Sequence, residues 1–228
     1  MSIVINNISK IFNNNKVLNK ISFKANPGDI VGILGPNGAG KSTMMKIITG
    51  YYKQSEGEVF VCTKNNLEDE IFIKKRIGYL SEENPLYHDM YVLEFLEFIC
   101  DIHKIDYLNC EKMINLTELN TVKNKKIKTL SKGFQQRVGI AQALIHNPEL
   151  IILDEPTSGL DPKQLIEIRK IIKNIGKEKT ILLSTHIIQE VEAMCNRVII
   201  LNEGKVMINK KIEDFDKKIE NVFLELIK

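Results

Sequence analysis

One glycine-rich segment constrains the fold of this 228-residue chain more than any other feature. It fits the pattern G-x-x-x-x-G-K-[S/T], and its residues are Gly35, Pro36, Asn37, Gly38, Ala39, Gly40, Lys41, Ser42 and Thr43. The five apolar residues 30–34 before it are typical of a strand that is buried on both faces. The residues after it have helical spacing up to Gly50. A strand, a glycine-rich turn and a helix in this order predict a phosphate-binding loop in an α/β fold.

The residue types of this segment suit phosphate binding. Glycines let backbone N–H groups close around phosphate oxygens without Cβ clashes, and a helix N-terminus carries about half a positive charge. Lys41 is predicted to act as a point charge for the β- and γ-phosphates, and Ser42 to offer its hydroxyl to Mg²⁺. The segment therefore predicts a nucleotide site with a magnesium ion.

A second segment, residues 151–155 (IILDE), completes such a site. Three apolar residues predict a buried strand, and ligands of open α/β sheets bind where strands end at their carboxyl side. We expect Asp154 to hold Mg²⁺ and Glu155 to orient or deprotonate the attacking water. An apolar run that ends in Asp-Glu is a weak signal alone, but it is specific beside the phosphate-binding loop.

The rest of the chain divides into three patterns. Alternating apolar residues predict strands near the N-terminus, at 3–5 and 18–23. An amphipathic helix is predicted from about residue 91, with apolar residues at 92, 95, 96 and 99, and the lysine-rich residues 123–128 are expected to form a loop. A further helix is predicted from its N-cap Ser131 to about residue 146. The last third alternates strands and helices, which predicts βαβ units and a mostly parallel sheet. Its expected elements are strands 150–153, 180–184 and 198–201 and helices 162–175 and 187–194.

Composition excludes several classes of protein. The 32 basic and 29 acidic residues give a net charge of only +3, so charge gives no reason to expect a nucleic acid partner. No apolar run reaches the roughly 18 residues of a membrane span, and the N-terminus lacks a secretory pattern. The four cysteines lack metal-binding or redox spacing, so we expect them reduced in a cytoplasmic protein.

Four motifs in a fixed order, the glycine-rich loop at 35–43 being the first, resemble those of the ATP-binding cassette (ABC) ATPases. Residues 130–137 (LSKGFQQR) are similar to the signature motif, and residues 154–162 (DEPTSGLDP) to the Walker B motif with its D-loop. Residues 184–186 (STH) are similar to the switch-histidine loop, and Phe12 stands where the family places an aromatic residue. The resemblance covers nearly the whole chain.

The resemblance implies a P-loop NTPase fold. A RecA-like core with a mostly parallel sheet would carry an antiparallel β subdomain and an inserted α-helical subdomain. On this reading residues 1–83 and 148–228 form the ATPase core, and residues 84–147 form the helical signature subdomain. The whole chain would be a single ABC transporter domain.

The resemblance also implies how ATP is bound and hydrolysed. ATP with Mg²⁺ would lie between the phosphate-binding loop of one protomer and the signature motif of another, where Ser131 and Gly133 meet the γ-phosphate. Phe12 would stack on adenine, although a strand-end core residue is the alternative. His186 would act with Lys41 and Glu155 in catalysis. Asp161 would serve the dimer interface, unless it only caps a helix.

Two motifs depart from the family pattern. Lys132 and Phe134 replace the Gly and Gln of the common LSGGQ signature, whereas Ser131 and Gly133 are kept. We expect nucleotide binding to survive, with Lys132 adding positive charge near the phosphates. Glu82 replaces the usual Gln of the Q-loop and is expected to be a tolerated variant that can ligate Mg²⁺.

Residues 77–96 are similar to the drug-export, lipid-export and gliding-motility types of ABC ATPase. This implies an ATP-hydrolysing subunit on the cytoplasmic face of the cell membrane, which drives a separate transmembrane permease. The ATPase subunits would pair as a homodimer or with a paralogue. The alternative is a non-transport ATPase with one cassette, such as the iron–sulfur assembly type.

Overall fold

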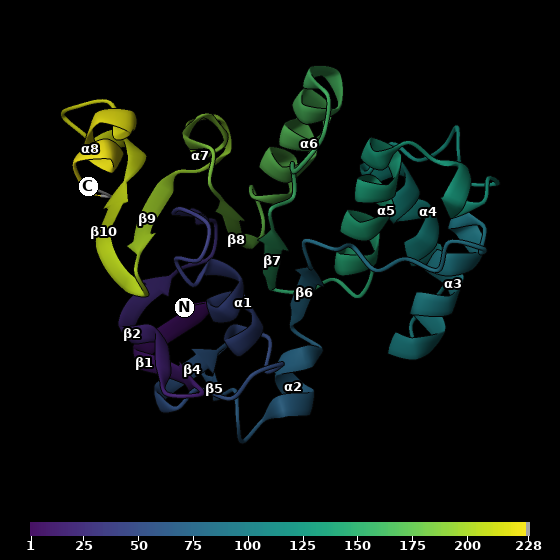
Figure 1. Ribbon diagram of the computed structural model, residues 1–228. Coiled ribbons are helices and arrows are strands. Elements are labelled where there is room, and N and C mark those ends of the chain that lie inside the picture. Colours follow the sequence, from purple (N-terminus) through teal and green to yellow (C-terminus); the bar gives the residue numbers. More distant parts are fainter. Residues whose placement is uncertain (227–228) are drawn as a thin grey trace.

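The computed structural model describes residues 1–226, which form two β-sheets and three groups of helices (Figure 1). The larger sheet has six strands in the order β10-β9-β3-β8-β7-β6, and all neighbours are parallel except β10 and β9. Its strands are β3 (Ile30–Leu34), β6 (Ile77–Leu80), β7 (Leu150–Asp154), β8 (Thr180–Thr185), β9 (Arg197–Asn202) and β10 (Lys205–Lys211). The mixed α/β class predicted from the sequence is confirmed.

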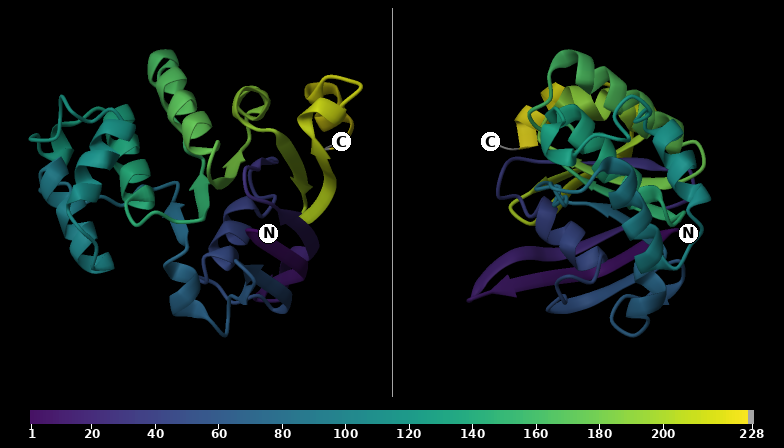
Figure 2. Two further views of the ribbon diagram at one scale, coloured as in Figure 1. Left: turned by 180° about the vertical axis from the view of Figure 1, so that it is seen from behind. Right: turned by 90° about the vertical axis from the view of Figure 1, so that its right-hand side faces the viewer.

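A smaller antiparallel sheet is built from the N-terminal part of the chain. Its strands, in the order β2-β1-β4-β5, are β1 (Ile3–Phe12), β2 (Asn15–Ala25), β4 (Glu56–Val61) and β5 (Lys64–Asn65). Helix α1 (Lys41–Ile48) packs between the two sheets, with Met44 and Met45 fully buried (Figures 1 and 2). The short helix α2 (Glu70–Lys74) leads from the small sheet into β6. The phosphate-binding loop is thus supported from both sheets.

The other face of the large sheet is covered by helices α6 (Pro162–Ile175), α7 (Ile188–Met194) and α8 (Ile219–Leu226). The side chains of strand β7 pack alternately into the cores on the two faces of the sheet. Ile152 belongs to the core on the α1 side, whereas Ile151 and Leu153 pack in the core on the α6 side. A parallel strand with helices on both faces needs apolar residues at every position, which explains the continuous run read from the sequence.

A third group of helices has a hydrophobic core of its own. It contains α3 (Val92–His103), α4 (Leu108–Leu116), the 3₁₀ turn at Ile127–Thr129 and α5 (Lys132–Leu144). The core runs from Leu86 to Ile145 and is separate from the cores of the large sheet. Helix α5 approaches β6 so closely that a Cβ on Gly78 would lie 2.0 Å from the Ala143 carbonyl oxygen. We propose that residues 1–83 and 148–228 form one structural unit and that residues 84–147 form a second one.

Several expected elements differ in extent. The predicted strands 3–5 and 18–23 are parts of the longer β1 and β2, and the helix expected up to residue 146 ends at Leu144. Helices α2, α4 and α8 and the edge strand β10 had not been assigned from the sequence. None of the helices between residues 1 and 226 has both the length and the apolar character that a membrane span requires.

Candidate nucleotide-binding site

The predicted motifs meet at one edge of the large sheet. Gly35 follows β3, Glu82 lies just beyond β6, Asp154 ends β7 and His186 follows β8. These four strands are parallel neighbours, so their carboxyl ends lie together. Segments that are more than 100 residues apart in the chain therefore form one site at the edge where open α/β sheets bind ligands.

The glycines of the loop are required by close packing and by backbone conformation. A Cβ on Gly35 would lie 2.3 Å from the carbonyl oxygen of Leu201. Gly40 has a φ of +99°, and a Cβ there would come within 2.6 Å of the Leu18 side chain. Any larger residue at these two positions would push the loop away from its neighbours. Glycine therefore keeps the backbone N–H groups of the loop at the N-terminus of α1.

The ammonium group of Lys41 lies inside the loop. Its Nζ donates hydrogen bonds to the carbonyl oxygens of Gly35 at 2.8 Å and Pro36 at 3.2 Å. It is also 3.6 Å from Oε1 of Glu155, and both side chains are buried. This buried cation is placed where the phosphates of a loop-bound nucleotide would lie.

Glu155 is held from both sides. Its Oε2 lies 3.1 Å from Nδ1 of His186, and its backbone N–H donates to Oγ of Ser184 at 3.0 Å. The residue is only 7% exposed and has a φ of +49°. A non-glycine residue in the left-handed region costs on the order of 1–3 kcal/mol, and such strain concentrates at functional sites.

Asp154 is the most deeply buried acid of the site, at 2% exposure. Its Oδ1 accepts hydrogen bonds from Oγ of Ser42 at 3.1 Å and from the hydroxyl of Ser184. Glu82 lines a cavity together with Ser42 and Asp154. A hydroxyl and carboxylates that converge in this way are hard oxygen ligands, so these residues fit the magnesium ion that the sequence predicts.

The cavity at this edge has a volume of about 570 Å³. It is lined by Val17, Asn37, Gly38, Gly40, Lys41, Ser42, Thr43, Glu82, Glu155, Ser158 and His186. Sequence reasoning had not singled out Val17 or Ser158 as site residues. Ser158 lies three residues after Glu155, within the same motif, so its position could have been predicted. Val17 belongs to no motif, and only the folding of β2 against the loop brings it to the site.

Phe12 is not among the residues that line this cavity. It ends β1 and is half-buried, with its ring edge-on to Tyr52 at a centroid distance of 5.3 Å. The ammonium of Lys10 lies 4.6 Å from the centre of the same ring. Both roles considered for Phe12, adenine stacking and strand-end packing, are compatible with this position.

The structure does not bring Ser131 and Gly133 into the cavity of the same chain. Ser131 caps α5, and its Oγ accepts the N–H of Phe134 at 3.4 Å. Gly133 is buried, and a Cβ there would lie 2.6 Å from the side chain of Gln164 at the start of α6. Among the described residues, the phosphate-binding loop and the signature thus belong to separate parts of one protomer.

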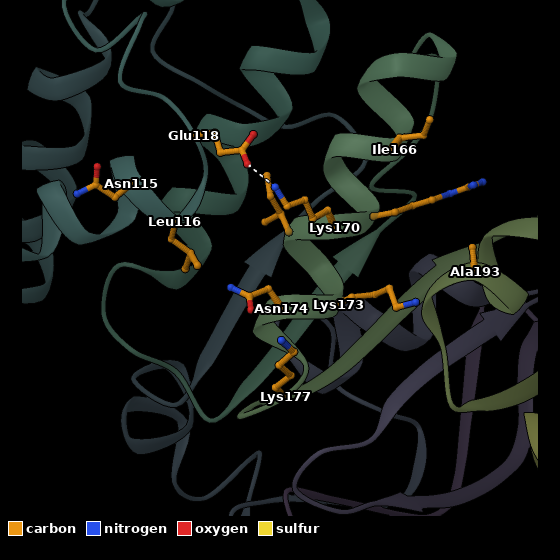
Figure 3. A pocket seen from close by; sticks show the side chains of 11 residues that line it. Asn115, Leu116, Glu118, Ile166, Lys170, Lys173, Asn174, Lys177 and Ala193 are labelled. Carbon is orange, nitrogen blue, oxygen red and sulfur yellow. Dashed lines mark hydrogen bonds and ion pairs between the residues drawn. The ribbon is translucent and has the colours of Figure 1, made fainter.

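A larger cavity, of about 830 Å³, runs along α6 between α4 and α7 (Figure 3). It exposes Lys173 and Lys177, and Lys170 pairs with Glu118 across it at 3.2 Å. The glycine-rich loop and the acids at the strand ends do not line it. It is therefore not the site that the motifs build.

A smaller cavity, of about 410 Å³, adjoins the candidate site and shares Ser42, Glu82 and Asp154 with it. Two of its lining residues have buried polar atoms without a hydrogen-bond partner among the described residues, namely the Tyr79 hydroxyl and Oδ1 of Asn84. Burial, with the charge of Asp154 second, raises the pKa of Tyr79 above its usual value. A buried polar group without a partner costs free energy, so this cavity is suited to a partner with polar atoms.

Comparison with known proteins gives consistent results. The family model described as ABC transporter matches residues 18–158. The ABC transporter ATP-binding protein MJ1023 of Methanocaldococcus jannaschii, itself uncharacterized, is 40% identical over 95% of this chain and 80% of its own length. The lantibiotic transport ATP-binding protein SrtF of Streptococcus pyogenes is 33% identical over 96% of this chain and 94% of its own.

Solved structures agree with the sequence relatives. One, titled as the structure of an ATP-binding subunit of an ABC transporter, covers both chains completely with a TM-score of 0.90 and 25% identity. The cassette MJ0796, solved as a dimer in a post-hydrolysis state with ADP and phosphate, has a TM-score of 0.83 and 30% identity. That match covers 93% of this chain and 100% of the other.

Proposed function

The chain belongs to the ABC transporter family of ATP-binding proteins, and from that premise we propose that it powers an exporter through ATP-dependent closure of a dimer. It is an ATPase of that family. Its partner would be a separate transmembrane permease, which holds the protein at the cytoplasmic face of the membrane. Similarity to SrtF, a lantibiotic transport ATP-binding protein, and to BcrA of Bacillus licheniformis, a bacitracin transport ATP-binding protein, supports a transport role.

One observation carries the dimer proposal. The cavity contains Lys41, Glu155 and His186, whereas Ser131 and Gly133 lie outside it on the helical part of the same chain. A site that needs both sets of residues is completed only by a second protomer in head-to-tail orientation. Either a second copy or a paralogue can supply the signature.

Binding would use the loop and the strand ends. Backbone N–H groups of residues 35–43 would surround the phosphates, and Lys41 would exchange its carbonyl partners for phosphate oxygens. Ser42, Asp154 and Glu82 would hold Mg²⁺, which supplies charge neutralisation to the phosphoryl group. Phe12 would stack on the adenine.

Hydrolysis depends mostly on positioning and on electrostatic stabilisation. Glu155 would orient the attacking water and accept its proton. His186, 3.1 Å from that carboxylate, would fix its direction and contact the γ-phosphate. Ser131 and Gly133 of the partner protomer would add backbone and hydroxyl donors at the N-terminus of α5, an end that attracts anions.

The small cavity beside Glu82 is the proposed contact for the permease. It adjoins the magnesium residues, and its Tyr79 hydroxyl and Asn84 amide oxygen have no partner among the described residues. The exposed ring of Tyr51 stands at its rim. A segment of the permease bound here would respond directly to events at the phosphates.

Dimer closure is tested with Glu155→Gln, which keeps the size of the side chain but removes the base. We expect a monomer without nucleotide and a stable dimer with ATP in size-exclusion chromatography with light scattering. Hydrolysis should fall by orders of magnitude. Lys125→Gln, a substitution at an exposed site on the helical part, is the matched control. A monomer at all ATP concentrations, or wild-type turnover in Glu155→Gln, would contradict the mechanism.

The transport role needs a separate test. The C-terminally tagged protein should be purified from detergent-solubilised membranes of its own cell, and its partners identified by mass spectrometry. A polytopic membrane protein at about equal amount would support the exporter subunit. Recovery with iron–sulfur assembly proteins in the soluble fraction would move the same ATPase into the non-transport class.

A further inference from the structure

Lys132 is the residue by which this chain departs from the glycine common in the signature. It is the first residue of α5, between the N-cap Ser131 and the buried Gly133, and it is exposed. The first turn of α5 contains no acidic residue. A cation at the N-terminus of a helix is unfavourable by itself, because it adds to the positive end of the helix dipole. Its presence there therefore calls for a negative partner.

The side chain of Lys132 lies over the D-loop. A Cβ built on Gly159 would be 2.3 Å from Nζ of Lys132 and 3.4 Å from its Cε. Gly159 has a φ of +67° and follows Ser158, which lines the nucleotide cavity. The ammonium thus occupies space that any other residue at position 159 would fill.

The frame around this contact is rigid. Gly133 packs directly on Gln164, whose backbone N–H is capped by Oδ1 of Asp161 at 2.9 Å. One turn further on, the buried guanidinium of Arg137 pairs with Glu167. These contacts fix the starts of α5 and α6 against each other, so the flexible part is the long side chain of Lys132.

We propose that Lys132 is a positioning residue with two alternative partners: the D-loop at Gly159 in the single protomer, and the γ-phosphate of the partner's ATP in the closed dimer. This inference rests on the proposed dimer. Among the described residues, the ammonium has no ion pair or hydrogen bond, so little opposes its transfer. Departure of the side chain releases the D-loop beside Ser158 when the second nucleotide arrives.

The physical reason for the transfer is charge. The triphosphate carries several negative charges, and a lysine ammonium bonded to phosphate is a strong charge-assisted donor. Over Gly159 the ammonium makes no ion pair among the described residues. Arrival of the partner's ATP therefore pulls Lys132 away from the D-loop of its own protomer. Closure at the site where Lys132 meets that ATP thus frees the D-loop beside the protomer's own nucleotide cavity.

The first partner is tested without nucleotide. Hydrogen exchange with mass spectrometry is measured on the peptide that contains residues 157–161, in the parent, Lys132→Gln, Lys132→Arg and Lys125→Gln. We expect a several-fold faster exchange in Lys132→Gln alone, because the D-loop loses its cover. Lys132→Arg retains a long cation and should stay near the parent. This measurement does not depend on dimer formation.

The second partner is tested in the Glu155→Gln background with ATP. Sedimentation equilibrium should show about a ten-fold weaker dimer for Lys132→Gln, which corresponds to about 1.4 kcal/mol. The loss should shrink as salt rises from about 0.05 to 0.5 M, because screening weakens the parent more. ATP binding to the single protomer should not change, and Lys132→Arg should restore the dimer.

The outcomes separate the two ideas. Unchanged exchange in Lys132→Gln overturns the D-loop partner, and an unchanged dimer constant overturns the phosphate partner; either result refutes the switch. A parent that fails to dimerise with ATP refutes the proposed dimer itself. In that case a changed exchange rate would still show that Lys132 covers the D-loop.

Discussion

The hydroxyl of Ser184 joins the two acids of the candidate site, and its removal tests how this site is held together. Ser184 is fully buried at the end of β8. Its Oγ donates to Oδ1 of Asp154 and accepts the backbone N–H of Glu155 at 3.0 Å. Ser184→Ala therefore deprives a buried carboxylate and a buried N–H group of a partner in one step.

The size of the effect follows from these two bonds. A hydrogen bond to a charged group contributes about 1.5–3 kcal/mol, and one between neutral groups about 1 kcal/mol. We expect Ser184→Ala to lower the free energy of unfolding by about 3 kcal/mol. At about 2–4 °C per kcal/mol for a chain of this size, Tm should fall by about 9 °C.

Urea unfolding without nucleotide measures the change, with Ser55→Ala as control. Ser55 is exposed and accepts a single N–H from Ile11, so its loss should cost less than about 0.5 kcal/mol. At a temperature where Ser184→Ala is folded, its kcat should fall by about ten-fold or more, because Glu155 is no longer fixed. Stability within about 0.5 kcal/mol of the parent and an unchanged kcat would refute this reasoning.

Three further predictions use other parts of the molecule. Phe12→Ala should weaken ATP binding by about 1–3 kcal/mol in a fluorescent-nucleotide titration. An unchanged Kd would leave Phe12 as a partner of Tyr52 only. Glu82→Gln should keep substantial steady-state ATPase activity, and loss of turnover with intact ATP binding would contradict its role as a tolerated variant. Burial, with His103 second, lowers the pKa of His146 to about 4. Below about pH 6.5 the unfolded chain therefore takes up a proton that the folded chain does not, so stability should fall by about 1–2 kcal/mol between pH 6.5 and 5. In urea unfolding, His146→Gln should not show this loss of stability at low pH. If the stability of both proteins changed equally with pH, His146 would be excluded as the source of the loss.

Elements with strong local signals were predicted to the residue. The strand at 30–34 and the helix at 162–175 have the bounds of β3 and α6. A strand buried on both faces is a continuous apolar run, and the helix begins with the N-cap Asp161 followed by proline. In these places local chemistry and tertiary packing require the same structure.

Weakly patterned elements were not predicted. Helix α4 buries only Cys110 and Ile114, so its apolar stripe is too thin to recognise. The edge strand β10 is largely exposed and paired on one side, with only Val206 and Ile208 half-buried in its middle. Tertiary contacts rather than local pattern decide the structure of both segments.

Some contacts of the candidate site could likewise be predicted from the sequence, and others could not. Contiguous motifs predicted which residues gather at the sheet edge, because their spacing within the chain is fixed. The bridging hydroxyl of Ser184 and the cover of Gly159 by Lys132 join segments that only the folded chain brings together. Contacts of this kind depend on side-chain direction, which a single sequence does not record.

The strand order also determines when the protein can fold during synthesis. The central strand β3 pairs with β8 and β9, which leave the ribosome about 150 residues later. At about 5–20 residues per second this delay is roughly 8–30 s. The small antiparallel sheet pairs within the first 65 residues, and the helical part has a core of its own, so both can form meanwhile. The apolar run of β3 stays without neighbours throughout, and nascent chains stalled before residue 180 should therefore recruit chaperones to that run.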